Sequence, residues 1–402
     1  MPGPLPEGDP VPADGTLPAS ALVQVARRPL GFYVHVPFCR VRCGYCDFNT
    51  YVLDQAGTRG PGDWLTAAHA EIDLASRVLG EQAPPVSTVF FGGGTPTLMS
   101  PAQLGGLVSH IAERFGLADG AEVTTEANPE TVGPAELEGL LAVGISRLSL
   151  GMQSAVPHVL ATLDRVHTPG RALEVVAEAR SAGFRSVSLD LIYGTPGESL
   201  DDWRASLEAA VSSGVEHVSA YALGIEPGTA MGRRVARGEL APTDDDVQAD
   251  MYLEAERVLT SAGFANYEVS NWATGPEHQA RHNLGYWLGH HWWGVGPGAH
   301  SHVGGVRWWN VKLPAQYTAA LSAGRSPGQA REVLDDESRR VERVLLELRL
   351  ADGLPLDVLT ARERARLDGF GARGLVTVAS GRVRLTLQGR LLADAVVRDL
   401  LD

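Results

Sequence analysis

Short apolar runs alternate with segments of helical periodicity from residue 30 to about residue 223. Six of these runs predict strands, at 32–38, 86–91, 122–127, 145–150, 186–194 and 217–223. Helical spacing of the apolar positions predicts helices at 61–80, 101–115, 134–143, 170–182 and 199–213. Because the apolar runs are short and nearly continuous, both faces of the sheet should be covered. Strand–helix units in tandem predict an α/β fold with a parallel sheet and outer helices, either doubly wound or an incomplete barrel.

The pattern changes on both sides of this region. Residues 1–28 are rich in proline and glycine and lack periodicity, which predicts a disordered arm. A helix predicted at 243–262 precedes a segment dense in histidine, tryptophan and glycine. The last part of the chain predicts helix, helix, hairpin and helix, an order similar to a winged helix. The predicted divisions are therefore 1–28, 29–240, 241–334 and 335–402.

The charge balance excludes several classes of partner. Acidic residues number 48 against 34 basic ones, which gives a net charge of −14. A general nucleic-acid binder needs a basic surface, and the region 335–402 is itself locally neutral. No apolar run is long enough for a transmembrane helix, and the first residues lack the basic start of a secretion signal. We therefore expect no nucleic-acid binding, no membrane insertion and a location in the cytoplasm.

All 3 cysteines lie close together, as Cys39, Cys43 and Cys46. Thiolates are the ligands of iron–sulfur clusters, and three of them leave one iron of a 4Fe–4S cluster without a protein ligand. Such an open coordination position can bind and activate a small molecule. The alternative is a structural zinc site with His35 as the fourth ligand, because zinc prefers four ligands.

The sequence around the cysteines, YVHVPFCRVRCGYCDF, resembles the motif of radical S-adenosylmethionine proteins. More narrowly, it resembles the oxygen-independent coproporphyrinogen III oxidases and the related HemW haem chaperones. The resemblance runs from about residue 30 to 402, through FGGGTPT, TTEANP, GISRLSLGMQS, DLIYGTPGE, YALGIEPGT, YEVSNWA and RHNLGYW. It implies a partial (β/α)6 radical SAM barrel with a C-terminal α+β extension and a winged-helix-like domain. It also implies a 4Fe–4S cluster and S-adenosylmethionine as cofactors.

Polar side chains at the ends of successive predicted strands suggest a site that binds amine, carboxylate and hydroxyl groups. The resemblance assigns S-adenosylmethionine to Tyr33, Gly93, Gly94, Thr95, Glu126, Gln153, Arg165 and Asp190. Glycines allow a ligand to approach the backbone closely. Arg165 lies in LDRVH where the family pattern is LGRxH, so Asp164 departs from that pattern. Each carboxylate could instead cap a helix, and Tyr33 could be a core aromatic residue.

Residues 272–309 hold half of the 12 histidines and most of the 8 tryptophans. Aromatic walls, an imidazole ligand and cationic groups for propionates are what a haem site needs. The motif HNxxYW resembles that of the HemW family, which implies haem binding by His282, Asn283, Tyr286 and Trp287. Arg281 and Arg307 are candidates for the propionates. The alternative is that His282 and Asn283 are hydrogen-bonded residues that fix a domain junction.

One position bears on the choice between carrier and catalyst. The oxidases of this family typically read CxxxCxxCxC, but here Phe48 follows Cys46 by two residues. Phenylalanine cannot supply a ligand bond, a proton or an electron. We therefore predict a haem chaperone without coproporphyrinogen oxidase activity. The alternatives are an oxygen-independent coproporphyrinogen III oxidase or a radical enzyme with another substrate. The resemblance further implies respiratory haemoproteins as acceptors, peripheral membrane association through an acceptor, and a homodimer.

Overall fold

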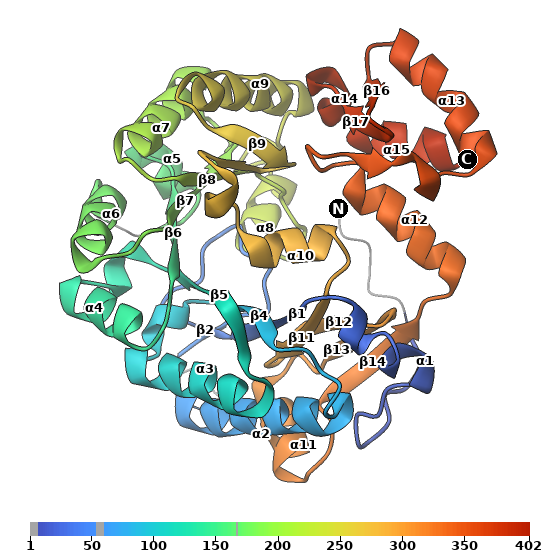
Figure 1. Ribbon diagram of the computed structural model, residues 1–402. Coiled ribbons are helices and arrows are strands. Elements are labelled where there is room, and N and C mark those ends of the chain that lie inside the picture. The colour runs from blue at the N-terminus through green and yellow to red at the C-terminus, as the bar shows by residue number, and fades with distance from the viewer. Residues whose placement is uncertain (1–6, 54–59, 166–167) are drawn as a thin grey trace.

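The computed structural model describes residues 7–53, 60–165 and 168–402. Within these ranges, six parallel neighbouring strands confirm the predicted strand positions. They are β1 (Leu30–Val36), β4 (Val86–Gly93), β5 (Leu117–Ala127), β6 (Arg147–Gln153), β7 (Val187–Tyr193) and β8 (His217–Ala222). Figure 1 shows the strands in an arc with the helices outside them. Most residues of these strands are buried, as expected when helices cover a sheet.

The helices that cover the strands begin and end close to the predicted residues. They are α2 (Pro61–Leu79), α3 (Pro101–Phe115), α4 (Pro134–Ala142), α6 (Arg171–Ala182), α7 (Leu200–Ser212) and α9 (Asp245–Ser261). The Ser100 side chain accepts from the Gln103 N–H while Gln103 bonds back to Ser100, which fixes the start of α3. Gly183 ends α6 with φ 111°, a conformation that favours glycine. None of the helices in the described ranges has the length and apolar character to cross a bilayer.

Residues 241–334 add strands to both edges of the same sheet. One edge gains β10 (Asn271–Ala273) and β9 (Ala265–Glu268), whereas the other gains β11 (His291–Val295), β12 (His300–Val303), β13 (Val306–Asn310) and β14 (Gly328–Val333). Strand β11 runs parallel to β1, with Leu30 beside His291. The full order is β14-β13-β12-β11-β1-β4-β5-β6-β7-β8-β10-β9. The division at residue 241 therefore stays a prediction, because no break in the sheet marks it.

The prediction of a disordered arm was wrong for residues 7–28; residues 1–6 lie outside the described part of the chain. The backbone of Asp9 pairs with that of Arg331 on β14, with N–O distances of 2.7 and 2.8 Å. Leu17, Ala21 and Val25 are buried in the main core. Their four-residue spacing gives this segment one apolar face, which includes the short helix α1 (Ala19–Leu22). The high proline and glycine content of residues 1–28 predicted disorder because the apolar spacing extends over only a few residues.

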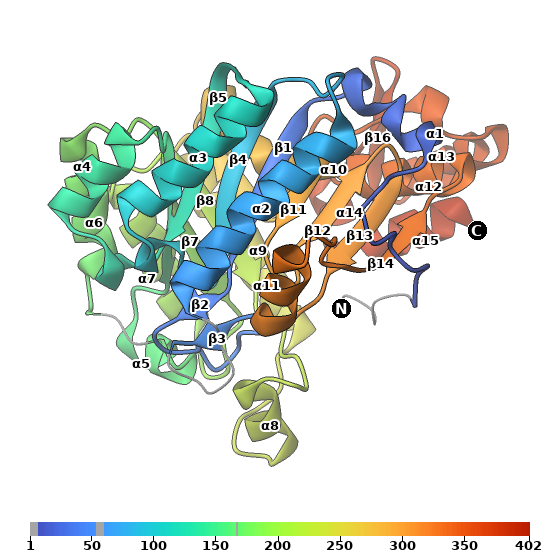
Figure 2. The same cartoon turned by 90° about the horizontal axis from the view of Figure 1, so that it is seen from below.

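Residues 335–402 have a hydrophobic core of their own. The elements are α12 (Asp336–Glu347), β15 (Leu354–Pro355), α13 (Ala361–Ala372), β16 (Val376–Ala379), β17 (Arg382–Leu385), α14 (Leu387–Leu391) and α15 (Ala393–Leu401). Strands β15, β17 and β16 form a small antiparallel sheet. Figure 2 shows this region at the far end of the molecule from α4 and α6. The winged-helix assignment itself stays a prediction.

Candidate functional site

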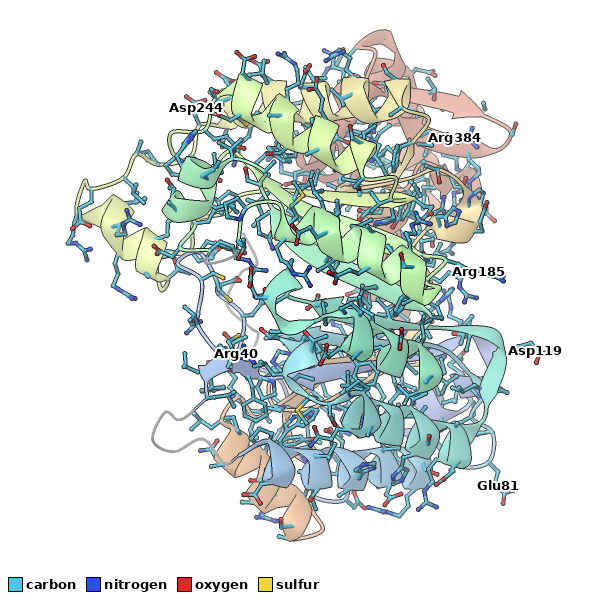
Figure 3. All side chains as sticks on the ribbon, turned by 90° about the vertical axis from the view of Figure 1, so that its left-hand side faces the viewer. Arg40, Glu81, Asp119, Arg185, Asp244 and Arg384 are labelled. Carbon is cyan, nitrogen blue, oxygen red and sulfur yellow. The ribbon has the colours of Figure 1, made fainter. Side chains whose placement is uncertain are left out.

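A cavity of about 910 Å³ lies where the parallel strands end. Gly93, Glu126, Gln153 and Ile192 line it, and each is at or next to the last residue of β4, β5, β6 or β7. In Figure 3, Arg40 of the loop beside this cavity lies at the opposite end of the sheet from Asp119 and Arg185, which are close to the starts of β5 and β7. Ligands of parallel α/β sheets bind at the carboxyl ends of the strands.

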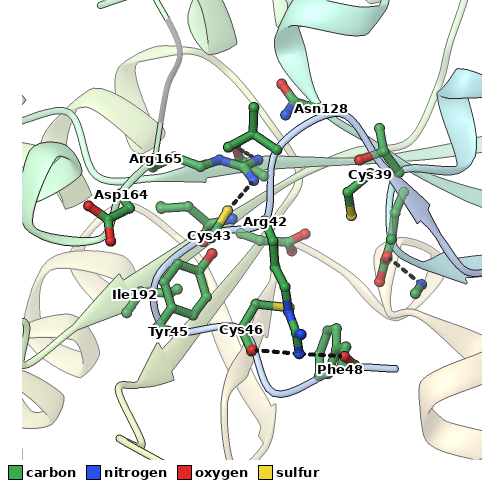
Figure 4. Close-up of a pocket in the computed structure, with 18 of the residues that line it drawn as sticks. Cys39, Arg42, Cys43, Tyr45, Cys46, Phe48, Asn128, Asp164, Arg165 and Ile192 are labelled. Atoms are coloured by element: carbon green, nitrogen blue, oxygen red, sulfur yellow. Dashed lines mark hydrogen bonds between the residues drawn. The ribbon is translucent and has the colours of Figure 1, made fainter. Parts of the chain in front are cut away.

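The three cysteines line this cavity: Cys39 is the last residue of β2 (Phe38–Cys39), and Cys43 and Cys46 are on the loop that follows. Cys39 is buried, whereas Cys43 and Cys46 are half-buried. Burial raises the pKa of the Cys39 thiol, and the neighbouring Cys46 and Cys43 add to the effect. The Arg165 guanidinium donates to Cys43 Sγ at 3.4 Å, as Figure 4 shows. The loop therefore presents three free thiols to one cavity, with a cation beside them.

The zinc alternative lacks its fourth ligand in this structure. His35 Nδ1 bonds to the Tyr33 hydroxyl at 2.9 Å, and His35 Nε2 bonds to the Asn49 carbonyl at 2.9 Å. Both ring nitrogens of His35 are therefore engaged. Among the described residues, no three His, Cys, Asp or Glu side chains converge on a single-ion site. A 4Fe–4S cluster binds each thiolate through a different iron, so its three cysteines need not converge on one point. The donor set fits such a cluster.

The glycine-rich loop after β4 passes very close to β2. The Gly94 N–H donates to the Val36 carbonyl at 2.8 Å. A Cβ atom on Gly94 would lie 2.4 Å from the Phe38 carbonyl oxygen, which is too close for any side chain. Gly93 has φ 109°, a conformation that favours glycine. This backbone, with Thr95, forms one wall of the cavity, where the predicted ligand contacts are expected.

Two carboxylates face the cavity from strands β5 and β7, which lie on either side of β6. Burial, followed by the charge of Asp190, raises the pKa of Glu126 to about 8. Burial also raises the pKa of Asp190, although the Ser149 hydroxyl donates to it at 2.8 Å. The Gly93 N–H donates to Glu126 at 3.2 Å. A cationic ligand would stabilise the ionised form of both carboxylates.

Gln153 and Arg165 complete the predicted set at this cavity. Gln153 has φ 66°, which is rare for a residue other than glycine and is typical of functional sites. Arg165 donates to the Gly151 carbonyl at 3.0 Å, and its Nε has no partner among the described residues. Asp164 has φ 51°, so this position requires the left-handed conformation that the family glycine adopts easily. Although Asp164 stands where the family pattern has glycine, the next residue, Arg165, still lines the cavity.

Tyr33 does not line the cavity. Its hydroxyl bonds to His35, and its ring stacks on Phe90 with centroids 6.2 Å apart. Burial, followed by the charge of Glu126, raises the pKa of Tyr33 well above its usual value. Tyr33 is therefore close to Glu126 without lining the cavity itself. Its contact with S-adenosylmethionine stays a prediction.

The HNxxYW residues lie at the other end of the strands, on α10 (Arg281–Trp287). His282 is buried, and its Nδ1 bonds to the Thr88 hydroxyl at 2.8 Å while its Nε2 bonds to the Tyr286 hydroxyl at 2.9 Å. The His282 N–H donates to Glu122 at 3.0 Å. Burial lowers the pKa of His282 to about 3, so its ring is neutral. Both ring nitrogens are engaged, which leaves none for a metal in this conformation.

The other motif residues point to different neighbours. Asn283 donates to Glu268 at 3.3 Å, and Trp287 lines a second, smaller cavity. The motif therefore does not gather its four side chains around one space. The two propionate candidates are also engaged: Arg281 lies 3.8 Å from Glu122, and Arg307 pairs with Glu332 at 2.8 Å and with Glu342.

Many residues that line the cavity were not predicted from the sequence, and four of them show why. They are Tyr45, Ser149, Ile192 and Tyr221. Tyr45 lies between two of the cysteines, so its position in CGYC was an available signal. Ser149 is two residues after the start of β6 and orients Asp190, a role that only the pairing of β6 with β7 reveals.

Comparison with known proteins places this architecture in a family context. Residues 33–210 match the radical SAM superfamily. The haem chaperone HemW of Mycobacterium tuberculosis is 53% identical over 380 residues, which cover 94% of this chain and 97% of that protein. HemW of Bacillus subtilis is 32% identical, over 90% of this chain and 97% of that protein. The structure of coproporphyrinogen III oxidase (HemN) from Escherichia coli matches with a TM-score of 0.81 at 24% identity, over 98% of this chain and 96% of that one; at this identity it shows a shared fold.

Proposed function

Since this chain belongs to the HemW family of radical S-adenosylmethionine proteins, we propose that it is a haem chaperone that binds haem and passes it to acceptor proteins. The likeness to haem chaperones over almost the whole chain carries this proposal. Phe48 supports it: the side chain is 58% exposed beside the cluster loop, where the related oxidases have a cysteine. The protein then has no coproporphyrinogen oxidase activity.

Cys39, Cys43 and Cys46 would hold a 4Fe–4S cluster in this proposal. When bound and reduced, such a cluster supplies one electron to the sulfonium of S-adenosylmethionine. Glu126 and Asp190 would bind the cationic groups of that ligand, since both carboxylates are buried without a cation bonded to them in the described structure. The backbone at Gly93 and Gly94 excludes side chains and would position the ligand against the cluster.

The proposed partners follow from the same assignment. Haem is the cargo, and the acceptors are respiratory haemoproteins, to which the protein would bind peripherally at the membrane, singly or as a homodimer. The cytoplasm is the proposed location, because thiols stay reduced there and remain free to bind iron. HNxxYW is the proposed haem-linked motif, although the contacts of His282 support a structural role for that residue.

Anaerobic reconstitution tests the cluster and the cargo separately. The full chain is incubated with iron and sulfide, its iron and sulfide are counted, and haem is then titrated while the Soret band is recorded. The expected result is a 4Fe–4S spectrum together with saturable haem binding. Zinc in place of iron, or the absence of saturable haem binding, would contradict the proposal.

The coproporphyrinogen III oxidase alternative needs its own assay. The reconstituted protein is supplied anaerobically with S-adenosylmethionine, a reductant and coproporphyrinogen III. No protoporphyrinogen should form above the rate of a Cys43→Ala control, which lacks one cluster ligand. Product formation at an enzymatic rate would overturn the assignment as a chaperone.

A further inference from the structure

A second cavity, of about 190 Å³, lies at the end of the sheet opposite the cysteines. His291, the first residue of β11, lines it and pairs with Leu30, the first residue of β1. The 3-10 helix η1 (Val25–Arg27) forms another side, and α12 of the C-terminal region forms a third. Trp287 of the HNxxYW motif completes the wall. Three parts of the chain that are distant in sequence therefore meet around one space.

The lining of this cavity is rich in arginine. Arg27, Arg28 and Arg339 line it, and none has a carboxylate within 4.0 Å among the described residues. Arg343 also lines it and pairs with Glu347 at 2.7 Å. The acidic residue of the lining, Glu342, is already paired with an arginine outside the cavity. In a protein with a net charge of −14, this local excess of positive charge favours an anionic ligand.

The two histidines of the lining, His291 and His302, differ in their hydrogen bonds. His302 Nδ1 lies 3.1 Å from the His290 carbonyl oxygen. A carbonyl oxygen only accepts, so Nδ1 carries the proton and Nε2 keeps a lone pair that no hydrogen bond engages within the described ranges. Metal-binding histidines have this arrangement, with the far nitrogen donating to a carbonyl. His282 and His291 have both ring nitrogens engaged, His291 with the Gln24 carbonyl and the Gly304 N–H.

We propose that this second cavity binds the propionate-bearing edge of haem, with the propionates on Arg27, Arg28 and Arg339 and the iron on Nε2 of His302. The inference rests on the proposed function, because it locates the site of the same cargo. Ligand pockets that enclose a small molecule measure about 300–1,000 Å³, so a cavity of about 190 Å³ takes only part of the macrocycle. The rest of the ring stays accessible, which suits a protein that must pass haem to an acceptor.

Haem titration of the reconstituted full chain tests the iron ligand. His302→Ala should shift the Soret band and weaken binding at least about 10- to 100-fold, since perturbing even the groups that support metal ligands has effects of that size. His300→Ala is the matched control, because His300 lies on the same strand, is exposed and does not line the cavity. His282→Ala should leave the Soret position unchanged. Reconstitution beforehand occupies the cysteines, which would otherwise bind haem iron.

The role of the arginines is tested by comparing haem with haem dimethyl ester, in which the propionates carry no charge. Arg27→Gln combined with Arg339→Gln should weaken haem binding about 10-fold or more, as expected for the loss of charge-assisted hydrogen bonds. The same double variant should bind haem dimethyl ester as the unchanged protein does, because esterification removes the propionate charge. Arg185→Gln combined with Arg325→Gln, at two exposed positions that do not line the cavity, is the charge-matched control. Arg27 and Arg339 are at the surface of the cavity and are not core residues, so loss of folding is not expected in the double variant.

The outcomes separate the two levels of the hypothesis. If the unchanged protein does not bind haem, the proposed function fails and the site fails with it. If the unchanged protein binds haem but His302→Ala keeps its Soret band while His282→Ala loses it, only the location is wrong. Equal losses for haem and its dimethyl ester in the arginine variant would also overturn the location.

Discussion

At the carboxyl ends of the parallel strands, charged side chains are buried with incomplete sets of partners, whereas at the amino ends His282 is fully partnered. Arg165 Nε has no partner within the described ranges, and Glu126 has a pKa raised to about 8. His282, in contrast, bonds to Thr88, Glu122 and Tyr286. Polar atoms without hydrogen-bond partners and the positive φ of Gln153 are typical of ligand-binding sites. Both features are found at the cavity that contains the cysteines.

The contrast shows that a residue of a sequence motif need not have a side chain that is free to bind a ligand. His282 belongs to a recognisable motif, yet its contacts hold α10 against Thr88 of β4 and Glu122 of β5. His302 belongs to no motif that the sequence singled out, yet it lines a basic cavity and keeps one ring nitrogen without a hydrogen bond among the described residues. The hydrogen bonds of each histidine therefore distinguish a structural residue from a candidate ligand-binding residue, which the sequence motif alone does not do.

Removal of a cysteine should have the largest effect. Cys43→Ala leaves two thiols, and we expect iron and sulfide content after reconstitution to fall to the level of unspecific binding, because no other cysteine can replace it. Arg40→Ala in the same exposed loop should load normally. A variant that still held four irons per chain would show that the cluster lies elsewhere.

The next largest effect concerns the stability of the opposite end. His282→Ala removes a buried ring and leaves Thr88 and Tyr286 without their partner, so we expect a loss of about 2–5 kcal/mol in the free energy of unfolding. Chemical denaturation of the protein measures it. His300→Ala, at an exposed position, should change stability by less than about 1 kcal/mol. Equal stability of the two variants would contradict a structural role for His282.

Ligand affinity at the carboxyl end should depend on pH through Glu126. Its pKa is raised to about 8, so below that pH the free protein holds a proton that a cationic ligand must displace. Affinity for S-adenosylmethionine should therefore rise up to about 10-fold per pH unit from pH 6.5 and level off above pH 8. Equilibrium dialysis of the reconstituted protein measures it.

Glu126→Gln should bind more weakly at pH 8 and lose this pH dependence. Glu138→Gln, an exposed carboxylate on α4, should keep it. The same shift affects folding: since the folded pKa of Glu126 exceeds the unfolded value, its contribution to stability is greatest below about pH 4.5 and is lost as the pH rises toward 8. An unchanged pH profile in Glu126→Gln would remove this carboxylate from the site.

The smallest effect is expected at the rim of the cysteine loop. Arg42 donates to the carbonyl oxygens of Cys46 and Phe48 at 3.2 and 3.1 Å, as Figure 4 shows, but its side chain is exposed. Arg42→Ala should therefore lower the free energy of unfolding by about 1 kcal/mol or less. The iron content after reconstitution should be unchanged. Loss of iron in this variant would show that the loop depends on these two bonds for its shape.

The sequence predicted the parallel strands well because local patterns determine them. Apolar runs such as 86–91 and helix starts such as Ser100–Pro101 need no information from the rest of the chain. The cysteines and Glu126, Gln153, Arg165 and Asp190 reached one cavity because the ends of parallel strands lie at the same edge. Periodicity was therefore sufficient for the strands and helices, whereas the assignment of these residues to the site came from the resemblance to the family.

What the sequence could not predict comes from contacts between distant segments. The partners of His282, Thr88 and Glu122, are on strands that precede it by many residues, and no spacing links them to the motif. The docking of Asp9 along Arg331 is a backbone contact, which any side chain permits. The second cavity likewise needs η1, β11 and α12 together.

The pairing of β11 with β1 has a consequence for synthesis on the ribosome. Translation proceeds at about 5–20 residues per second, so β1 waits many seconds for a neighbour that is encoded near residue 291. During that time one edge of β1 is open to any other nascent strand. Pulse-labelled ribosome-bound chains should accordingly stay protease-sensitive until translation has passed β11.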